Sequence, residues 1–485
     1  MSDSSRRKTN LKVVGLAVAG AVGGFLFGFD SSVVNGAVDA VQQQFKLSAA
    51  LTGFAVASAL TGCAIGAYLA GRIADRWGRI PAMIVGAVLF LASAIGAGLA
   101  IGVWDLVFWR VVGGLGIGMA SVIAPAYIAE ISPRMLRGRL ASLQQLAITV
   151  GIFAALLSDT LFANAAGLAS SPSWFGLEAW RWMFLAGAVP AVVYGVIAIR
   201  LPESPRFLVL KDRKDDVRKI FARIWPDDDV ERAIRDMEAA IRIDAEGSKK
   251  GALRGNRFGL KPIVWIGIVL SIFQQFVGIN VIFYYSTTLW KAVGFQSRDS
   301  FTISVITSIT NILVTFVAIF LVDRVGRKPI LLFGSVGMTV SLGVMALAFS
   351  QARIVNGAPS LPGGWGPLAL IAANVFVVSF GASWGPIVWV LLGEIFPTRI
   401  RARALGISAA AQWVANFLVT ISFPPLASFS LVFTYGMYAL FAALSFFFVW
   451  KVVPETNGMS LEEANTLLPP KDSARSENQV VGARS

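Results

Sequence analysis

The sequence contains no histidine and a single cysteine, Cys63, among its 485 residues. Without histidine there is no His-based triad, imidazole metal cage or imidazole proton relay, so a group that switches its protonation must be a carboxylate. One cysteine cannot form an intrachain disulfide, and Cys63 stands in an apolar run where we expect it to pack in the interior. The sequence therefore predicts neither a metal site nor a cofactor.

Charged residues are also scarce. They make up 14% of the chain, whereas the apolar set makes up 56%, and about 25% charged residues is usual in soluble domains. This composition is a poor fit to a soluble globule, a disordered chain or a nucleic-acid-binding domain. The formal charge of +14 acquires a meaning only when the basic residues are located along the chain.

Long apolar runs dominate the sequence, and each is long enough to cross a hydrocarbon core of about 30 Å as a helix. A polar segment over 202–261 contains 15 Lys and Arg against 12 Asp and Glu, and we expect short amphipathic helices there. The predicted units are 1–201, a linker over 202–261, 262–453, and a tail over 454–485. Twelve spans are predicted to begin near Val13, Leu51, Pro81, Trp104, Ala141, Trp182, Pro262, Ser300, Pro329, Pro367, Ala404 and Leu431.

Basic residues gather in the short loops on one side of the predicted membrane. The opposite side carries only Lys46, Lys291, Arg298 and Arg353, with Arg181 at a boundary. Short loops rich in Lys and Arg stay in the cytoplasm, so both termini and the linker are predicted to be cytoplasmic, in a multi-pass cytoplasmic-membrane protein. The net charge thus reflects topology and contact with the lipid bilayer, not nucleic acid. The loop residues are Arg72, Arg76, Arg79, Arg134, Arg137, Arg139, Arg324, Arg327, Lys328, Arg399, Arg401 and Arg403.

The two halves of the chain repeat one another at three places, in the same order. Repetition at a nearly constant offset indicates two copies of one six-helix unit, and a substrate site between two such units is typical of alternating-access transporters. The paired segments are Asp75–Arg79 with Asp323–Arg327, Glu130–Arg134 (followed by Arg137 and Arg139) with Glu394–Pro397 (followed by Arg399, Arg401 and Arg403), and Pro202–Arg206 with, more loosely, Pro454–Gly458.

Together with Gln274–Asn280 and the pair Tyr284-Tyr285, these motifs resemble the sugar porter family of the major facilitator superfamily, from about Gly24 to Gly458. The resemblance implies an all-α membrane protein with the major facilitator fold: twelve transmembrane helices in two six-helix halves, with a cytoplasmic helical loop between them. The segment Gly28–Gly36 is most similar to bacterial proton-coupled glucose permeases, notably of actinobacterial type.

Asp30 lies in the middle of the first span, where an ionised Asp costs roughly 2.5–3.5 kcal/mol on insertion scales. Arg110, in the fourth span, is the candidate partner. The two residues form either a static structural ion pair or a proton carrier whose pKa depends on the distance to the Arg. The resemblance favours the carrier, because this position is an acid in the family's proton-coupled members. Asp159, towards the outer end of the fifth span, is expected to be solvated at the external mouth, and a role in proton coupling is the alternative.

Acids and arginines recur at the loop ends of the spans, where ion pairs can break and form as two bundles rock. The alternative interpretation is that Arg anchors the topology and the acids are incidental. The resemblance implies a gate network at the cytoplasmic face that holds the outward-open state. Its members would be Asp75, Arg76, Arg79, Glu130, Arg137, Glu203, Arg206, Asp323, Arg324, Arg327, Glu394, Arg401 and Glu455.

Amides are unusually frequent inside the predicted spans. A sugar hydroxyl both donates and accepts, as an amide does, although a single amide in a span can also serve as interhelical glue. Gln274, Gln275 and Asn280 reach one cavity only if the seventh helix is interrupted or widely exposed, and Gly278 is placed to allow this. Tryptophans in spans most often pack or anchor, but the resemblance implies sugar contact for two of them. The predicted sugar site comprises Gln145, Gln274, Gln275, Asn280, Asn311, Trp389, Gln412, Trp413 and Asn416.

These observations predict a proton-coupled monosaccharide symporter that works by alternating access, with D-glucose as the best single substrate and a monomer as the functional unit. The alternatives are a facilitative sugar uniporter, a symporter for galactose, xylose or inositol, and a non-transporting sugar receptor. The short polar tail argues against a receptor, because it is too small for a signalling domain. An enzyme is not expected, since no nucleophile–base set is visible.

Overall fold

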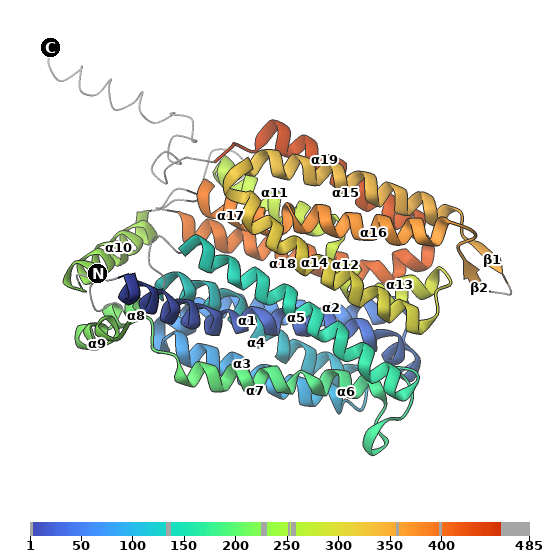
Figure 1. The fold of residues 1–485 in the computed structure, drawn as a ribbon, viewed down its shortest axis with the longest axis horizontal. Coiled ribbons are helices and arrows are strands. Elements are labelled where there is room, and N and C mark those ends of the chain that lie inside the picture. The colour runs from blue at the N-terminus through green and yellow to red at the C-terminus, as the bar shows by residue number, and fades with distance from the viewer. Residues whose placement is uncertain are drawn as a thin grey trace, which may run out of the picture.

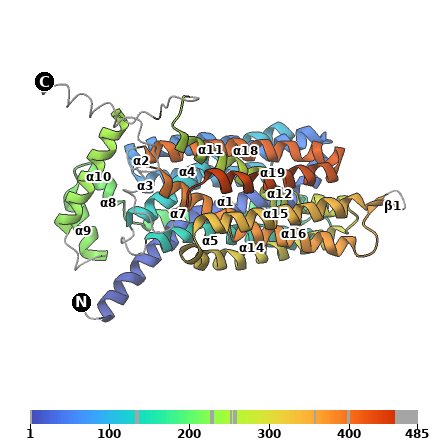
Figure 2. The ribbon, with the colours of Figure 1, turned by 90° about the horizontal axis from the view of Figure 1, so that it is seen from above.

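A computed structural model describes residues 3–131, 137–224, 230–250, 253, 259–355, 358–396 and 400–456. Within these ranges there are 12 helices or helix groups long and apolar enough to cross a membrane, as the sequence predicted. They run roughly parallel to the long axis of the molecule (Figure 1). The three linker helices lie at one end of the bundle, the linker end, and a small β-hairpin lies at the other, the hairpin end (Figure 2).

The first half contains six spans. Glycine and alanine are frequent at their contacts, and small residues let membrane helices approach closely. The spans are α1 (Asp3–Gln44), α2 (Ala49–Trp77), α3 (Arg79–Gly98), α4 (Val103–Ile131), α5 (Arg137–Ala166), and a sixth that is divided at Gly187 into α6 (Ala179–Ala186) and α7 (Ala188–Arg200), with a single 3₁₀ turn over Trp174–Gly176 before it.

The second half contains the other six spans, and two of them are interrupted. The seventh consists of α11 (Pro262–Phe276), α12 (Ile279–Tyr284) and α13 (Ser286–Ala292), and the tenth of α16 (Trp365–Gly381) and α17 (Trp384–Ile395). The others are α14 (Ser297–Val325), α15 (Arg327–Ser350), α18 (Arg401–Phe429) and α19 (Leu431–Val452). The interruption of the tenth span was not predicted from the sequence.

The linker forms α8 (Pro205–Leu210), α9 (Lys214–Ile224) and α10 (Val230–Lys250), as its amphipathic pattern predicted. Asp216 of α9 forms ion pairs with Arg213 and Lys219 on the surface of the linker. The hydrogen bonds from these two side chains lower the pKa of Asp216 below its ordinary value. The sequence did not predict the hairpin, in which β1 (Arg353–Val355) pairs antiparallel with β2 (Ala358–Ser360) between α15 and α16.

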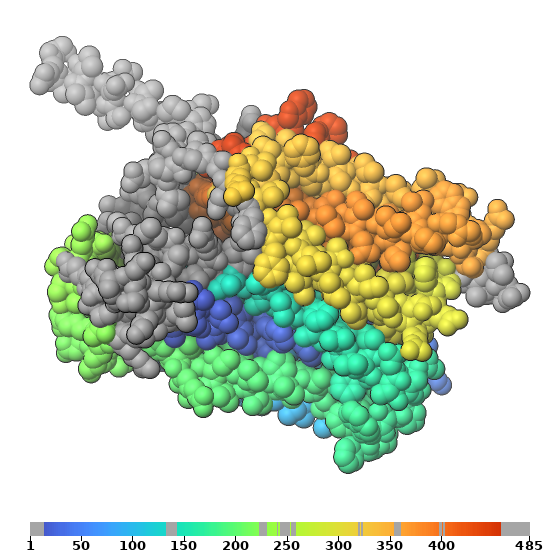
Figure 3. All heavy atoms as spheres, in the orientation of Figure 1, coloured from blue at the N-terminus to red at the C-terminus, as the bar shows by residue number. Residues whose placement is uncertain are grey.

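In the first half, the helices that carry Asp30 and Arg110 pack closely against their neighbours. A side chain at Gly28 of α1 would collide with the backbone carbonyl of Ile148 in α5, and one at Gly114 of α4 with that of Ala59 in α2. Between the halves, α2 packs against α18 and α5 against α14. The boundary between α5 and α14 is visible where teal spheres meet yellow ones (Figure 3).

Candidate functional site

The seventh span is interrupted at Gly278, which is the first of the two alternatives that the sequence left open. Gly278 adopts the left-handed conformation, with φ of 82°, and separates α11 from α12. A Cβ at this position would also lie 2.7 Å from the Tyr438 ring, so both the backbone and the packing require glycine. Across the break, the Asn280 Nδ2 donates to the Gln275 Oε1 at 2.6 Å. The break therefore brings together two amides that a continuous helix would place on different faces.

Gln274 joins the two interrupted spans. Its Nε2 donates to the carbonyl oxygens of Trp384 and Gly385, at 2.9 and 3.1 Å, in the first turn of α17. Its Oε1 is buried and has no hydrogen-bond partner in the described part of the chain. A buried acceptor without a partner costs free energy unless a ligand or water satisfies it. The side-chain Oε1 of Gln274 is thus a candidate acceptor for a donor that the described chain does not supply.

Four of the other predicted amides lie on neighbouring spans. In α14, Asn311 is buried, and a Cβ on Gly381 would lie 3.3 Å from its Oδ1. In α18, the Gln412 Oε1 has no partner among the described residues, while the Asn416 Oδ1 accepts from Thr420 at 3.2 Å. Gln145 of α5 is half-buried, and it is the only one of the predicted amides that comes from the first half.

The two predicted tryptophans differ in their surroundings. Trp413 meets Phe27 of α1 edge to face, with ring centroids 5.6 Å apart, and so joins the two halves. Trp389 has an exposed fraction of 42%, whereas Trp384 on the same helix is fully buried and donates to the Leu331 carbonyl at 3.1 Å. The sugar-contacting role of Trp389 stays a prediction.

Asp30 and Arg110 form a buried ion pair, as the sequence suggested. The Arg110 Nη1 donates to the Asp30 Oδ2 at 3.1 Å. The exposed fraction is 7% for Asp30 and 4% for Arg110. The same guanidinium also contacts the backbone carbonyls of Asp30 and Val56, at 3.4 and 3.5 Å, while its Nε is buried without a partner in the described chain. These weak secondary contacts leave Asp30 as the main counter-charge of Arg110.

A small cavity lies beside this ion pair. Besides Asp30 and Arg110, its lining includes Ser31, Cys63 and Tyr284. Cys63 is buried, as expected. Tyr284 comes from α12 of the second half, and its hydroxyl interacts with the side chains of Ser31 and Asn416. One tyrosine therefore contacts both the surroundings of the buried acid and a predicted sugar amide.

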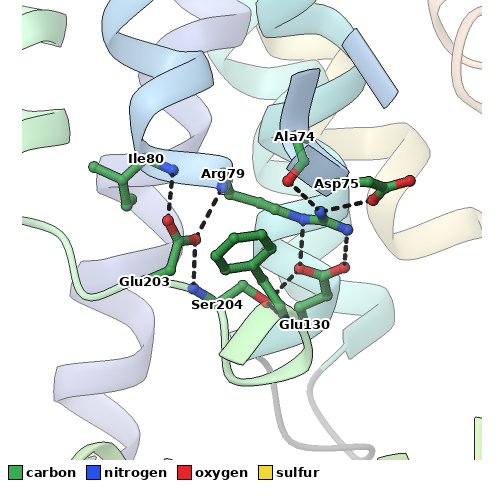
Figure 4. A network of polar contacts seen from close by, with 8 residues as sticks. Ala74, Asp75, Arg79, Ile80, Glu130, Glu203 and Ser204 are labelled. Carbon is green, nitrogen blue, oxygen red and sulfur yellow. Dashed lines mark hydrogen bonds and ion pairs between the residues drawn. The ribbon is translucent and has the colours of Figure 1, made fainter. Parts of the chain in front are cut away.

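At the linker end, the first half carries a compact polar network (Figure 4). Arg79 forms two parallel hydrogen bonds to Glu130, at 3.2 and 3.0 Å, and an ion pair with Asp75 at 3.0 Å. Glu203 accepts from the backbone N–H groups of Arg79 and Ile80, at 2.9 and 3.2 Å. Its carboxylate thereby caps the N-terminus of α3, where negative charge is favoured by the helix dipole.

The second half repeats this network. Arg327 forms two hydrogen bonds to Glu394, at 3.2 and 2.9 Å. Glu455 accepts from the backbone N–H groups of Arg327 and Lys328, both at 3.0 Å, and so caps α15. Thr456 donates to Glu394 at 2.6 Å, as Ser204 donates to Glu130 in the first half.

Other predicted network members are placed differently. Arg76 and Arg324 are exposed at the linker end, and the described structure gives neither a partner in the networks. Arg206 is half-buried. The side chains of Arg137, Asp323 and Arg401 lie outside the described part of the chain.

At the hairpin end, polar contacts join the two halves, and we call this group the hairpin-end seam. Thr287 donates to the Asn35 backbone carbonyl at 2.6 Å, and Asn35 accepts from the Thr287 N–H at 3.0 Å. Asp39 forms an ion pair with Lys291 at 2.8 Å and accepts from Thr288 at 2.6 Å. The seam was not predicted from the sequence, because its partners are about 250 positions apart. The opposite charges of Asp39 and Lys291, near the ends of the first and seventh spans, were the one local indication of it.

The expectation for Asp159 is wrong. The sequence placed its carboxyl in solvent, but the side chain is completely buried between α5 and α1. Its Oδ2 accepts from the Gly36 N–H at 3.2 Å. The absence of a side chain at Gly36 lets α5 approach closely enough to enclose the carboxyl.

Two six-helix halves, interrupted spans with inward amides, and a buried acid–arginine pair define a membrane transporter of the major facilitator type. Residues 16–468 match the model of the family described as sugar (and other) transporter. The chain is 53% identical to a glucose transport protein of Synechocystis over 95% of this chain and 99% of that protein. It is 35% identical to the D-xylose-proton symporter of Escherichia coli K12, with 95% and 96% covered.

Solved structures show the same fold. The inward open conformation of the xylose transporter XylE from E. coli matches with a TM-score of 0.78 at 33% identity, covering 94% of this chain and 100% of that chain. The proton:xylose symporter XylE bound to 6-bromo-6-deoxy-D-glucose matches with a TM-score of 0.77 at 34% identity, covering 94% and 99%. The chain belongs to the sugar porter family of the major facilitator superfamily.

Proposed function

We propose that this protein is a proton-coupled monosaccharide symporter with D-glucose as its substrate. The observation that carries the proposal is the buried Asp30–Arg110 pair beside a cavity whose lining includes Tyr284, a residue that also interacts with Asn416 of the amide group. Two similar proteins support it: the Synechocystis relative, at 53% identity, is named a glucose transport protein, and the Escherichia coli relative, at 35% identity, is named a D-xylose-proton symporter.

The proposed sugar site lies at the interruption of the seventh span. Gln275 and Asn280 form one bonded amide pair, and Gln274 and Gln412 each have a buried oxygen without a partner in the described ranges of the chain. Hydroxyls of a sugar can donate to these oxygens and accept from the amide nitrogens. Asn311, Gln145, Trp389, Trp413 and Asn416 complete the proposed site, which lies between the halves.

The proposed proton site is the Asp30 carboxyl. While Arg110 is 3.1 Å away, the attraction between the opposite charges favours the ionised acid. A shift of Arg110 or loss of water at the site favours the protonated acid instead. One proton moving down about 100 mV supplies roughly 2.3 kcal/mol, which sustains on the order of fiftyfold accumulation. One carboxylate is therefore sufficient for coupling.

In the proposed membrane orientation, the linker end is cytoplasmic and the hairpin end is external. The units over 1–201 and 262–453 would rock about the bound sugar, joined by the 202–261 linker, with both termini and the 454–485 tail inside. The two linker-end networks would act as the inner gate and the hairpin-end seam as the outer contact. All proposed site residues come from one chain, so a monomer would suffice.

Uptake of radiolabelled sugars into proteoliposomes tests the proposal. We expect D-glucose to accumulate inside when the external pH is lower, and to equilibrate without accumulation when no gradient is imposed. D-Xylose, D-galactose and myo-inositol serve as competitors that define the substrate. Equilibration of D-glucose at the same rate with and without the pH gradient would identify a uniporter, and saturable binding without uptake would identify a receptor.

A further inference from the structure

Asp159 is a buried acid for which the proposed cycle has no use. It lies in α5, and its side chain has no exposed surface. Its Oδ2 accepts one backbone hydrogen bond, from Gly36, and its Oδ1 has no partner among the described residues. A carboxylate normally has several donors or a cation when it is buried, because an unpaired ionised group inside a membrane protein is costly.

No cation reaches this carboxyl in the described structure. The helices packed against α5 are α1, α4, α6 and α14. Asp30 and Arg110 are paired with each other, and Asp39 with Lys291 of α13. Arg181 is paired with Glu178, and Asp105 accepts from the Ile101 N–H. The remaining charged groups of these helices towards the hairpin end, Arg298 and Asp299, are exposed.

The location of Asp159 connects it to the contact between the halves. Its donor, Gly36, directly follows Asn35, which bonds Thr287 of α13 and donates to Ser304 of α14 at 3.4 Å. Asp159 itself is on α5, which packs against α14 (Figure 3). The carboxyl is therefore enclosed at the place where α1 and α5 of one half meet α13 and α14 of the other.

We propose that Asp159 is a second proton-binding group, and that it must hold a proton whenever the hairpin-end seam is closed. In the closed seam the carboxyl has, among the residues that the structure describes, one N–H donor and no cation, so it is neutral. When the halves part at this end, water reaches the carboxyl and it can release the proton. Closing the seam again then requires a proton, separately from the one bound at Asp30.

The proposal rests on the proposed alternation of the two ends but not on the role of Asp30. Its test therefore uses an Asp30→Asn background, in which Asp30 cannot titrate, together with Cys63→Ala. Accessibility of the seam is followed as the labelling rate of Ser304→Cys by a membrane-impermeant maleimide. The rate is divided by that of Gln296→Cys, an exposed position at the same end, to remove the pH dependence of thiol reactivity.

We expect the normalised labelling rate to rise about tenfold per pH unit above the pH at which Asp159 ionises in the open state, because one proton is linked to closure. Asp159→Asn cannot ionise and should abolish this rise while keeping the seam closed. Asp39→Asn removes the seam's ion pair and is the matched control: labelling should increase at every pH while the rise with pH remains.

Two results would overturn the proposal. One is a normalised rate that does not depend on pH when Asp159 is present. The other is a rate that depends on pH to the same extent in the Asp159→Asn variant. Either result is independent of whether Asp30 couples sugar to protons, because Asp30 is absent from every variant in the series.

Discussion

The two halves of the molecule are nearly identical at the linker end and different in the membrane. Arg79, Glu130 and Glu203 are matched by Arg327, Glu394 and Glu455 in almost every hydrogen bond. The buried acids Asp30 and Asp159, by contrast, belong to the first half, and all but one of the predicted sugar amides belong to the second. The repeated parts hold helix ends together, whereas the unrepeated parts contain the proposed proton and sugar sites.

Because the halves differ in the membrane, the substitution with the largest expected effect on stability and transport is at Arg110, a first-half residue that has no counterpart in the second half. Arg110→Leu leaves the Asp30 carboxyl buried without its cation, and removal of one partner of a buried ion pair costs about 3–5 kcal/mol. We expect a large loss of thermal stability in detergent and loss of coupled uptake. Asp30→Asn and Arg110→Leu combined should recover part of the stability; a double variant as unstable as the Arg110 variant would show that the pair is not the cause.

A smaller effect is expected in the second half, at the bonded amide pair. Gln275→Ala should weaken D-glucose binding by roughly five- to a hundredfold, since an unpaired buried polar group costs about 1–3 kcal/mol. Isothermal titration calorimetry on the purified protein measures the change.

A double-mutant cycle sharpens this prediction. Gln275 and Asn280 are hydrogen-bonded, so the losses of affinity caused by Gln275→Ala and Asn280→Ala should not add. Unchanged affinity in Gln275→Ala would remove this residue from the site. Fully additive losses would mean that the two amides act independently on the sugar.

The smallest effects are expected where the halves repeat. Glu203→Gln and Glu455→Gln each remove the charge that caps a helix N-terminus, an interaction of about 0.3–1 kcal/mol, up to about 2 when partly buried. The two variants should lower the melting temperature and the sugar exchange rate by similar amounts. Glu238→Gln in the exposed linker pair with Lys214 is the control and should change neither. Loss of transport in only one of the two capping variants would contradict the equivalence of the two linker-end networks.

Much of this organisation could be predicted from local sequence. Apolar runs predicted the spans, and the repeated Asp75–Arg79 and Asp323–Arg327 segments predicted the two halves. Gly278 between amides indicated where the seventh span could be interrupted, although a widely exposed helix was the alternative. Each of these signals lies within a few residues, where helix length, charge and glycine conformation determine structure.

Contacts between distant segments could not be predicted in the same way. The Asp39–Lys291 pair depends on how the halves close. The burial of Asp159 depends on the missing side chain at Gly36, on another helix. Exposure of a side chain inside an apolar span is set by the neighbouring helices and not by its own segment, which is also why Trp389 and Trp384 differ.

The most direct test of the account is accumulation of D-glucose by Asp30→Asn in proteoliposomes under an imposed pH gradient. The amide resembles the protonated acid but cannot release a proton, so we predict that accumulation is abolished. Binding of D-glucose and sugar exchange at equal concentrations should survive, because the proposed sugar contacts are made by other residues. If Asp30→Asn still concentrates D-glucose in response to the gradient, Asp30 is not the coupling group and the proposed mechanism is wrong.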